Sequence, residues 1–569
     1  MSVVSSPSPT TGSSFEPRVR RTSRKRRVTV ATARTRHTAR REHAIVFAVA
    51  FIVYLAIGLR LVVGEHLVIF DAMARLAHAY FVFHNDPPKL TAIGFVWAPL
   101  STLVFFPSVL IKPIATSLVA LPLTTAACGA GTVTLIGAAF RHFGMSRRLR
   151  LPLVVLIAAN PMLVYYSANG MSEMPYLFLL TAATYFFIRW YLNGAESLLI
   201  LTATCMALAT LTRYEMFAYV IAFAVAIVVI MWRRRQPQSV IEGTLIAYGA
   251  PVVYGIGLWI FFNALIVGDP LFWLRNQVAG ASGAQQSATA VVHHDYSVGQ
   301  ILSQLVHLNL GVNAVVIAAA VWLLAILILR RDRMAFALLL LLSVNAATTG
   351  LLILQAGELG YLQLRYNMRA LPIGLIAIGW VFYIASSRIR LAMWASMVAL
   401  LVVSIPITLQ TMDSYPYQYT EQAFVQAVRS GFTKDFEGVR VTGGYVLGDA
   451  DERQMADYVL RHVRRRNAIL TDDAQTLGVM LLSGRPELFF DRIDRSDRIW
   501  KQVLARPRGV VRYMLVQNVP KPPQGSDEIK LRWVGIARGA LPWARKVFAN
   551  RTYMLLAIVP PSLQGPRVR

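Results

Sequence analysis

The sequence is poor in charged residues. Only 15% of its 569 residues are charged, whereas 56% are apolar. Apolar runs of about 20 residues recur along the chain, and each is long enough to cross a bilayer. Soluble globular proteins do not have this composition. We therefore expect a polytopic α-helical membrane protein.

Acidic residues are also scarce: 57 Lys and Arg stand against 29 Asp and Glu, which gives a net charge of +28. In a soluble chain this excess would suggest nucleic acid as a partner. Here most basic residues lie in short clusters between apolar runs, as orientation signals do. The pattern therefore argues against a nucleic-acid partner and for contact with membrane lipids.

The chain has two cysteines, Cys128 and Cys205, and both fall inside apolar segments. No disulfide framework or thiolate metal site is implied. GxGxxG, Walker-type, HExxH and GxSxG motifs are also missing, so nothing indicates nucleotide binding, ATP hydrolysis, zinc proteolysis or a serine nucleophile.

The composition divides the chain into three parts. Residues 1–42 are rich in Ser, Thr, Pro and Arg and predict a disordered basic cytoplasmic tail, which either anchors the topology or binds anionic headgroups. Residues 43–410 hold the apolar runs. Residues 411–569 have no run of spanning length and predict an extracytoplasmic α/β domain. Its expected strands are Val439–Leu447, Ala468–Thr471, Tyr513–Gln517 and Thr552–Val559.

Four basic clusters, if all face the cytoplasm, set the topology of a multi-pass plasma-membrane protein with a cytoplasmic N-terminus. They are Arg141–Arg150, Arg233–Arg235, Arg330–Arg333 and Arg388–Arg390. Residues 93–140 resist this scheme, because two apolar helices separated by Lys112-Pro113 are expected where an odd number of crossings is needed. We therefore expect 11–13 transmembrane helices.

Two carboxylates are candidates for catalysis because they lie where membrane helices meet water. Asp71 follows the first apolar run and precedes a helical pattern, so it would lie near the positive end of a helix dipole, which favours the ionised form that a general base needs. Glu173 begins another helix, after Ser172. For both residues, helix capping is the alternative role.

Cations and an aromatic residue on the same expected face could hold a phosphate. Arg213 lies in a turn between two short apolar stretches, next to Glu215, and Arg365 and Arg369 flank Tyr366 four residues apart. Pairing of Arg213 with Glu215 and anchoring to lipid headgroups are the alternatives. His293 and His294 lie in a long loop; their adjacent spacing is poor for a metal, and acceptor contact or solvent exposure is the other interpretation.

Several short stretches, in this order, resemble the GT-C superfamily of membrane glycosyltransferases, in particular protein O-mannosyltransferases, lipid A aminoarabinose transferases and actinobacterial arabinofuranosyl- and mannosyltransferases. They are Asp71 with Pro99-Leu100, Asn160-Pro161 with Tyr165-Tyr166-Ser167 and Ser172-Glu173, Ala209–Arg213, and Gly268–Leu271.

The resemblance implies transfer of a sugar from a polyprenyl-phosphate donor to a glycan, lipid or protein of the cell envelope. Asp71 would deprotonate the acceptor hydroxyl, Glu173 would be a second acid, and Lys89 or Arg213 would neutralise the donor phosphate. Many relatives carry two adjacent acids in the first loop, whereas Ala72 follows Asp71 here. This departure leaves a divalent cation as an open question and assigns no metal ligand.

Two other classes of protein remain compatible with the sequence. A transporter or lipid flippase would have intramembrane charges and broken helices, and a non-catalytic envelope scaffold would use the outward domain to bind a partner. The candidate charges gather at one expected membrane face, which favours the glycosyltransferase.

Overall fold

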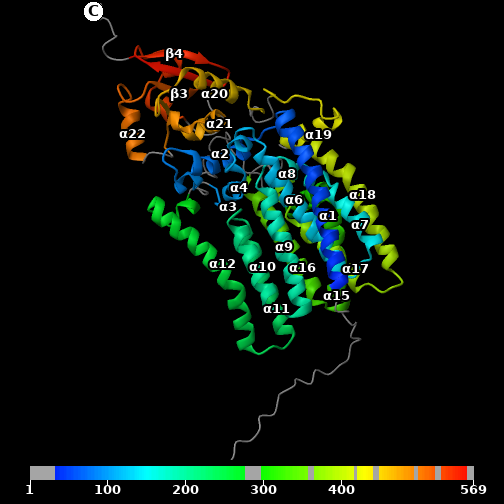
Figure 1. Ribbon diagram of the computed structural model, residues 1–569. Helices are drawn as coiled ribbons and strands as arrows, with labels where there is room; N and C mark the ends of the chain where they lie inside the picture. The colour runs from blue at the N-terminus through cyan, green and yellow to red at the C-terminus, as the bar shows by residue number, and fades with distance from the viewer. Residues whose placement is uncertain are drawn as a thin grey trace, which may run out of the picture.

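The computed structural model describes residues 33–95, 97–275, 297–356, 364–415, 419–439, 447–492, 497–518 and 527–559. His293, His294 and most of the strand expected over Val439–Leu447 lie outside these ranges. Within them, a bundle of long helices carries a smaller domain with a sheet at one end (Figure 1).

The apolar runs predict helices that start near residues 151, 173, 198, 215, 243, 312, 334, 370 and 391, and described helices of the bundle begin close to these positions. Seven described helices are long and apolar enough to cross a membrane, or nine if each of two bent pairs counts as one span. The helices are α1 (Ala33–Gly58), continued by the π-helix η1 (Leu59–Gly64), α6 (Ala120–His142), α7 (Arg147–Ala158), α8 (Pro161–Ala168), α9 (Glu173–Asn193), α10 (Glu196–Thr210), α11 (Met216–Arg233), α12 (Gln238–Val267), α14 (Val298–Val312), α15 (Ala314–Arg330), α16 (Arg333–Ala356), α17 (Ala370–Ile384) and α18 (Arg390–Ser414).

The polytopic helical fold is confirmed, but fewer described helices meet the criteria for a span than the 11–13 expected. Two helices account for part of the difference. α9 and α10 run beside the counted helices (Figure 1) and pack against each other, α6 and α12. However, α10 has only 15 residues, and α9 is not apolar enough to be counted.

The segment before α6 is broken into short pieces, so the expectation of two apolar helices around Lys112-Pro113 is wrong. Prolines cause the breaks, because each removes a backbone donor and restricts the preceding residue. Among the described residues of this segment, only α6 is long enough to cross a membrane. One crossing is the odd number that the charge pattern required. The pieces are η2 (Leu90–Ile93), α3 (Leu100–Leu103), α4 (Phe106–Val109) and α5 (Lys112–Thr116).

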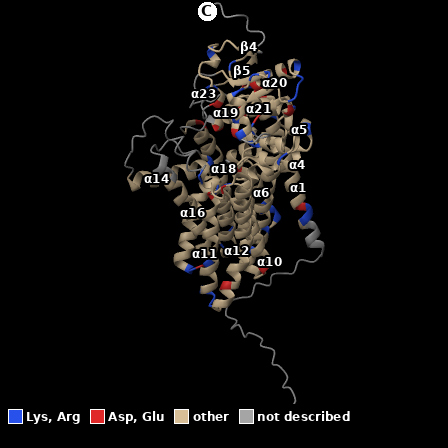
Figure 2. Ribbon diagram, turned by 90° about the vertical axis from the view of Figure 1, so that its left-hand side faces the viewer, with Lys and Arg blue, Asp and Glu red and all other residues tan. Residues whose placement is uncertain are grey.

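Lys and Arg positions mark the end of α11 and α12 that lies away from the sheet (Figure 2). Arg333 donates to the carbonyl of Arg233 at 2.8 Å, and Arg330 donates to that of Ile384 at 3.1 Å. These contacts place three of the turns side by side. The premise that the basic turns share one face agrees with this arrangement.

A mixed five-stranded sheet forms the centre of the smaller domain, in the order β2-β1-β3-β5-β4. β1 pairs in parallel with β2 and β3, and β5 pairs antiparallel with β3 and β4. The strands expected around β1, β3 and β5 are present. β2 has only two residues and β4 is largely exposed, so neither carries a clear apolar pattern. The strands are β1 (Ile469–Thr471), β2 (Phe489–Phe490), β3 (Tyr513–Gln517), β4 (Ala544–Ala549) and β5 (Tyr553–Ile558).

Five helices of the described residues accompany this sheet. They are α19 (Tyr419–Arg429), α20 (Ala450–His462), α21 (Asp473–Ser483), α22 (Asp497–Ala505) and α23 (Glu528–Arg532).

Helix α2 (Phe70–His84) lies between the bundle and the smaller domain (Figure 1). Most of its residues are buried, and it packs against α21. Tyr80 donates from its hydroxyl to the carbonyl of Gly484 at 3.2 Å. A Cβ on Gly478 of α21 would come within 2.8 Å of the Met73 side chain. The helix that carries Asp71 is therefore held by both parts of the molecule.

Close packing of α1, α6 and α8 depends on a glycine. A Cβ at Gly129 would lie 2.7 Å from the Ser167 Cβ and 3.2 Å from the Tyr54 ring. We expect Gly129→Ala to destabilise the protein by about 1–3 kcal/mol through overpacking, measured as a lower unfolding midpoint in detergent. Gly257→Ala is the control, because a Cβ there meets nothing within 4 Å. Equal midpoints for the two variants would contradict this account.

Candidate functional site

A cavity of about 400 Å³ opens at the end of the bundle that carries the smaller domain. Its wall comes from α2, the broken segment with α3, the start of α9, the α10–α11 turn, residues after α12, and η4 (Leu364–Asn367). The lining residues are Asp71, Arg75, Trp97, Ala98, Ser101, Met171, Ser172, Thr212, Arg213, Tyr214, Glu215, Trp273, Leu274, Arg365 and Tyr366.

Asp71 lies in the first turn of α2 and presents its carboxylate to this cavity. The N-cap of α2 is Ile69, which has no side-chain cap, so the helix does not use Asp71 as its cap. The Asp71 side chain is 32% exposed, and its Oδ2 lies 3.8 Å from the Arg75 guanidinium. Arg75 is almost fully buried, stacks over the Trp97 ring at 5.0 Å and donates to the Asp71 carbonyl at 3.2 Å. Arg75 therefore orients the acid while leaving it open to solvent.

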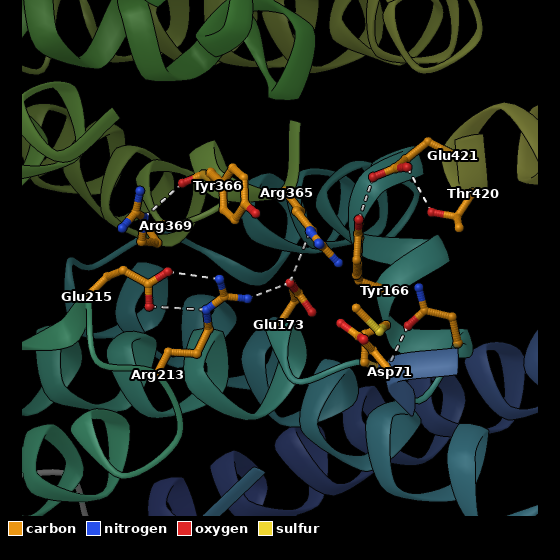
Figure 3. Close-up of polar contacts among 12 residues, drawn as sticks. Asp71, Tyr166, Glu173, Arg213, Glu215, Arg365, Tyr366, Arg369, Thr420 and Glu421 are labelled. Atoms are coloured by element: carbon orange, nitrogen blue, oxygen red, sulfur yellow. Dashed lines mark hydrogen bonds and ion pairs between the residues drawn. The ribbon is translucent and has the colours of Figure 1, made fainter. Parts of the chain in front are cut away.

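Arg213 is held between two carboxylates, as Figure 3 shows. It donates to the buried Glu173 at 2.7 Å and to Glu215 at 2.8 and 3.3 Å. Burial alone would raise the pKa of Glu215, which lies just before α11, but the Arg213 guanidinium outweighs burial and lowers it to about 2. The alternative that Arg213 pairs with Glu215 is therefore observed.

Glu173 connects this pair to a second cation. Its carboxylate is fully buried at the start of α9, and Ser172 makes no side-chain cap there. The oxygen that accepts from Arg213 also lies 3.9 Å from Nε of Arg365 (Figure 3). Arg365 stacks over the Tyr366 ring at 5.5 Å, and Arg213 stacks over the same ring at 5.7 Å. Three cations line the cavity: Arg75, Arg213 and Arg365. Arg213 and Arg365 both lie beside the Glu173 carboxylate, and Arg213 is the one that donates a hydrogen bond to it.

Two other residues predicted for the site, Arg369 and Lys89, do not line the cavity. Arg369 is buried behind the wall and donates from Nε to the Tyr366 carbonyl at 2.8 Å. The other two nitrogens of its guanidinium have no hydrogen-bond partner among the described residues. Lys89 precedes η2 and does not line the cavity. His293 and His294 lie outside the described residues.

Sequence analysis missed several wall residues, notably Arg75, Trp97, Tyr214 and Trp273. Arg75 had a local signal, because it follows Asp71 by four residues on a helix and such pairs face each other. The aromatic residues had none. Tyr214 and Trp273 contact each other at 4.7 Å between ring centroids although they are far apart in the chain, so only the fold brings them together.

Three described residues outside the lining have ligand atoms close enough together to hold a metal: His66, Glu437 and Asp449. Asp71 does not belong to this group.

The Glu173–Arg213 pair provides a direct test of this geometry. Arg213→Gln would leave a fully buried carboxylate without its closest cation, so we expect a loss of about 3–5 kcal/mol in stability, seen as a lower unfolding midpoint. Arg275→Gln is the control, because the Arg275–Asp269 pair is exposed and such pairs contribute little. An unchanged midpoint in Arg213→Gln would show that the pair does not hold the site together.

No family model and no curated protein matches the sequence. Among solved structures, ArnT from Cupriavidus metallidurans bound to undecaprenyl phosphate is similar, with a TM-score of 0.56, 12% identity and coverage of 92% of this chain and 99% of that chain. The same protein in the apo state gives a TM-score of 0.54 at 12% identity, covering 93% and 100%. The oligosaccharyltransferase AglB from Archaeoglobus fulgidus gives 0.43 at 12% identity, covering 84% and 69%.

The likeness to ArnT extends over the helical bundle and the smaller domain together, since it covers almost all of both chains. It confirms, at the level of the fold, the resemblance expected from the sequence: the chain has the fold of ArnT.

Proposed function

We propose that the chain is an inverting glycosyltransferase that moves a sugar from a polyprenyl-phosphate donor to a hydroxyl of a cell-envelope glycan, lipid or protein. One observation carries the proposal: the same cavity is lined by an accessible carboxylate, Asp71, and by the guanidinium of Arg365. The reaction needs one group of each kind.

The carboxylate serves the acceptor. Asp71 takes the proton from the acceptor hydroxyl while its oxygen attacks the anomeric carbon of the donor sugar. The new C–O bond forms as the bond from that carbon to the phosphate oxygen breaks, and a single displacement inverts the anomeric centre. The bonding electrons leave with the polyprenyl phosphate. Arg75 keeps the Asp71 carboxylate in place through the contacts already described.

The guanidinium serves the leaving group, whose negative charge grows as the bond breaks. Arg365 is the cation of the lining best placed for this role, because Arg213 is already occupied by Glu215 and Glu173. A guanidinium pairs with phosphate oxygens through two parallel donors. A fixed donor aimed at developing charge is a large source of rate enhancement. We assign Arg213 to positioning, since its contacts hold Glu173 and thereby Arg365.

The fold and the wall support a lipid-linked donor. ArnT, whose fold the chain shares, was crystallised bound to undecaprenyl phosphate. The cavity lies where a lipid phosphate at the membrane edge would meet water, and Trp97, Tyr214 and Trp273 offer apolar faces that a sugar ring can pack against. Because basic turns gather at the other end, we place the cavity and the smaller domain outside the cytoplasm.

The role of Asp71 predicts the behaviour of one conservative variant. Asp71→Asn removes the proton acceptor and preserves the shape, so we expect sugar transfer to fall by about 10²–10⁴-fold, with an unchanged unfolding midpoint. The measurement is consumption of radiolabelled polyprenyl-phosphate pentoses and hexoses by purified protein. Glu196→Gln, at the start of α10, is the control outside the cavity.

Transfer at the wild-type rate by Asp71→Asn would refute the assignment of the base. Movement of polyprenyl phosphate across vesicle membranes without sugar transfer, by wild-type protein, would instead identify a flippase, and inactivity with every donor would favour a scaffold.

The role of Arg365 predicts a second pattern. Arg365→Gln should lower kcat by about 10²–10³-fold, the cost of removing one donor to a developing charge, whereas Arg365→Lys should retain more activity because it keeps the charge. Steady-state kinetics with the active donor checks this. Equal losses in the two variants would show that Arg365 supports the wall and does not bind phosphate.

A further inference from the structure

A second group of chemically suitable side chains lies where the first extramembrane segment meets the smaller domain. His66 precedes α2, whereas Glu437 and Asp449 come from the chain before α20. One ligand atom from each of the three lies within 4.8 Å of the others. We propose that His66, Glu437 and Asp449 form a binding site for a divalent first-row transition metal that joins the two parts of the molecule.

The buried side chain of Asp449 does not cap the helix that follows it. It is fully buried and stands at the N-cap of α20, but its side chain makes no capping hydrogen bond. The Glu437 carboxylate caps the helix instead: it accepts hydrogen bonds from the backbone N–H groups of Asp449 and Ala450, at 3.0 Å each. Oδ2 of Asp449 lies 2.6 Å from the Arg453 guanidinium, whereas Oδ1 has no hydrogen-bond partner among the described residues. A buried carboxylate oxygen that accepts no hydrogen bond is stabilised when a cation binds beside it.

The neighbouring backbone brings the Glu437 carboxylate close to Asp449. Gly448 has a φ of +95°, and a Cβ there would lie 2.2 Å from Oε2 of Glu437. Only glycine permits both this backbone conformation and this approach. The two carboxylates are thus held near each other, and a divalent metal between them would balance their charge.

His66 is oriented by a partner of its own. Nδ1 lies 3.1 Å from Oδ1 of Asp435, which places the proton on Nδ1 and the lone pair on Nε2, the state in which an imidazole binds a metal. The backbone N–H of Phe436 donates to the carbonyl of Glu65 at 2.8 Å, so the two segments are already tied together beside the site. His66 also has a φ of +55°, uncommon for a residue other than glycine.

The donor set selects the class of metal. One imidazole and two carboxylates suit Zn²⁺ or Mn²⁺, whereas Ca²⁺ and Mg²⁺ prefer oxygen donors alone. Bonds of about 2.0–2.2 Å to such a metal would draw the three side chains together by small rotations. None of the three lines the cavity that contains Asp71. The metal would therefore fix the start of α2 to the smaller domain and take no part in sugar transfer.

The test is metal binding by purified full-length protein after treatment with EDTA. Calorimetric titration with Zn²⁺ or Mn²⁺ should show one ion per chain, and the electron paramagnetic resonance of bound Mn²⁺ should show coupling to an imidazole nitrogen. His66→Gln should abolish that coupling and weaken binding by more than about 100-fold, and Asp435→Asn should weaken it by about 10–100-fold, as removal of an orienting partner does. Glu437→Gln is a second ligand variant in case His66→Gln misfolds.

Two controls decide the location. His462→Gln, at an exposed histidine of α20 whose ring contacts only the Tyr458 ring and carbonyl among the described residues, should bind as the wild type does. Metal should raise the melting temperature of the wild type and leave that of His66→Gln unchanged. The proposal is overturned if the wild type binds no ion, or if binding survives His66→Gln and Glu437→Gln but is lost when His293 and His294 are replaced by Gln.

Discussion

The buried ion pair between Glu173 and Arg213 is the contact on which the geometry of the cavity depends. It joins the start of α9 to the α10–α11 turn, and the same carboxylate lies 3.9 Å from Arg365 in η4. Burying charges costs free energy unless they are paired with good geometry. The ion pair therefore serves to fix the positions of its side chains more than to stabilise the fold. It holds two guanidiniums beside one carboxylate oxygen: each nitrogen of Arg213 already donates to a carboxylate, whereas Arg365 lies 3.9 Å away from Glu173.

The placement of α2 is the second constraint. This helix carries both Asp71 and Arg75, and it is enclosed by the bundle on one side and by α21 on the other. A general base must be held within hydrogen-bond reach of its substrate, which a free surface loop does not ensure. The smaller domain therefore has a mechanical role, since its packing on α2 determines where the Asp71 carboxylate stands. The proposed metal at His66 would reinforce the same junction from the N-terminal side of α2.

Sequence reasoning located what depends on local patterns. Apolar runs between basic clusters predicted where the helices start, and Asp71, Glu173, Arg213 and Arg365 stood out because charge is rare beside membrane helices. Four of the predicted site residues besides Asp71 line the cavity: Arg213, Glu215, Arg365 and Tyr366. Features that depend on contacts between distant segments were not predicted. The aromatic wall comes from separate segments, and β4 is mostly exposed and lacks an apolar pattern. The prolines before α6 were visible, yet apolar composition outweighed them in predicting two apolar helices around Lys112-Pro113.

The central claim is that the cavity beside Asp71 binds the phosphate of a lipid-linked donor. The most direct measurement is an experimentally determined structure of the protein in lipid nanodiscs with added polyprenyl phosphate. The account predicts that the phosphate lies within hydrogen-bond distance of the Arg365 guanidinium, in the same cavity as Asp71. A phosphate bound at the end of the bundle that carries the basic turns, with the Asp71 cavity free of lipid, would contradict it.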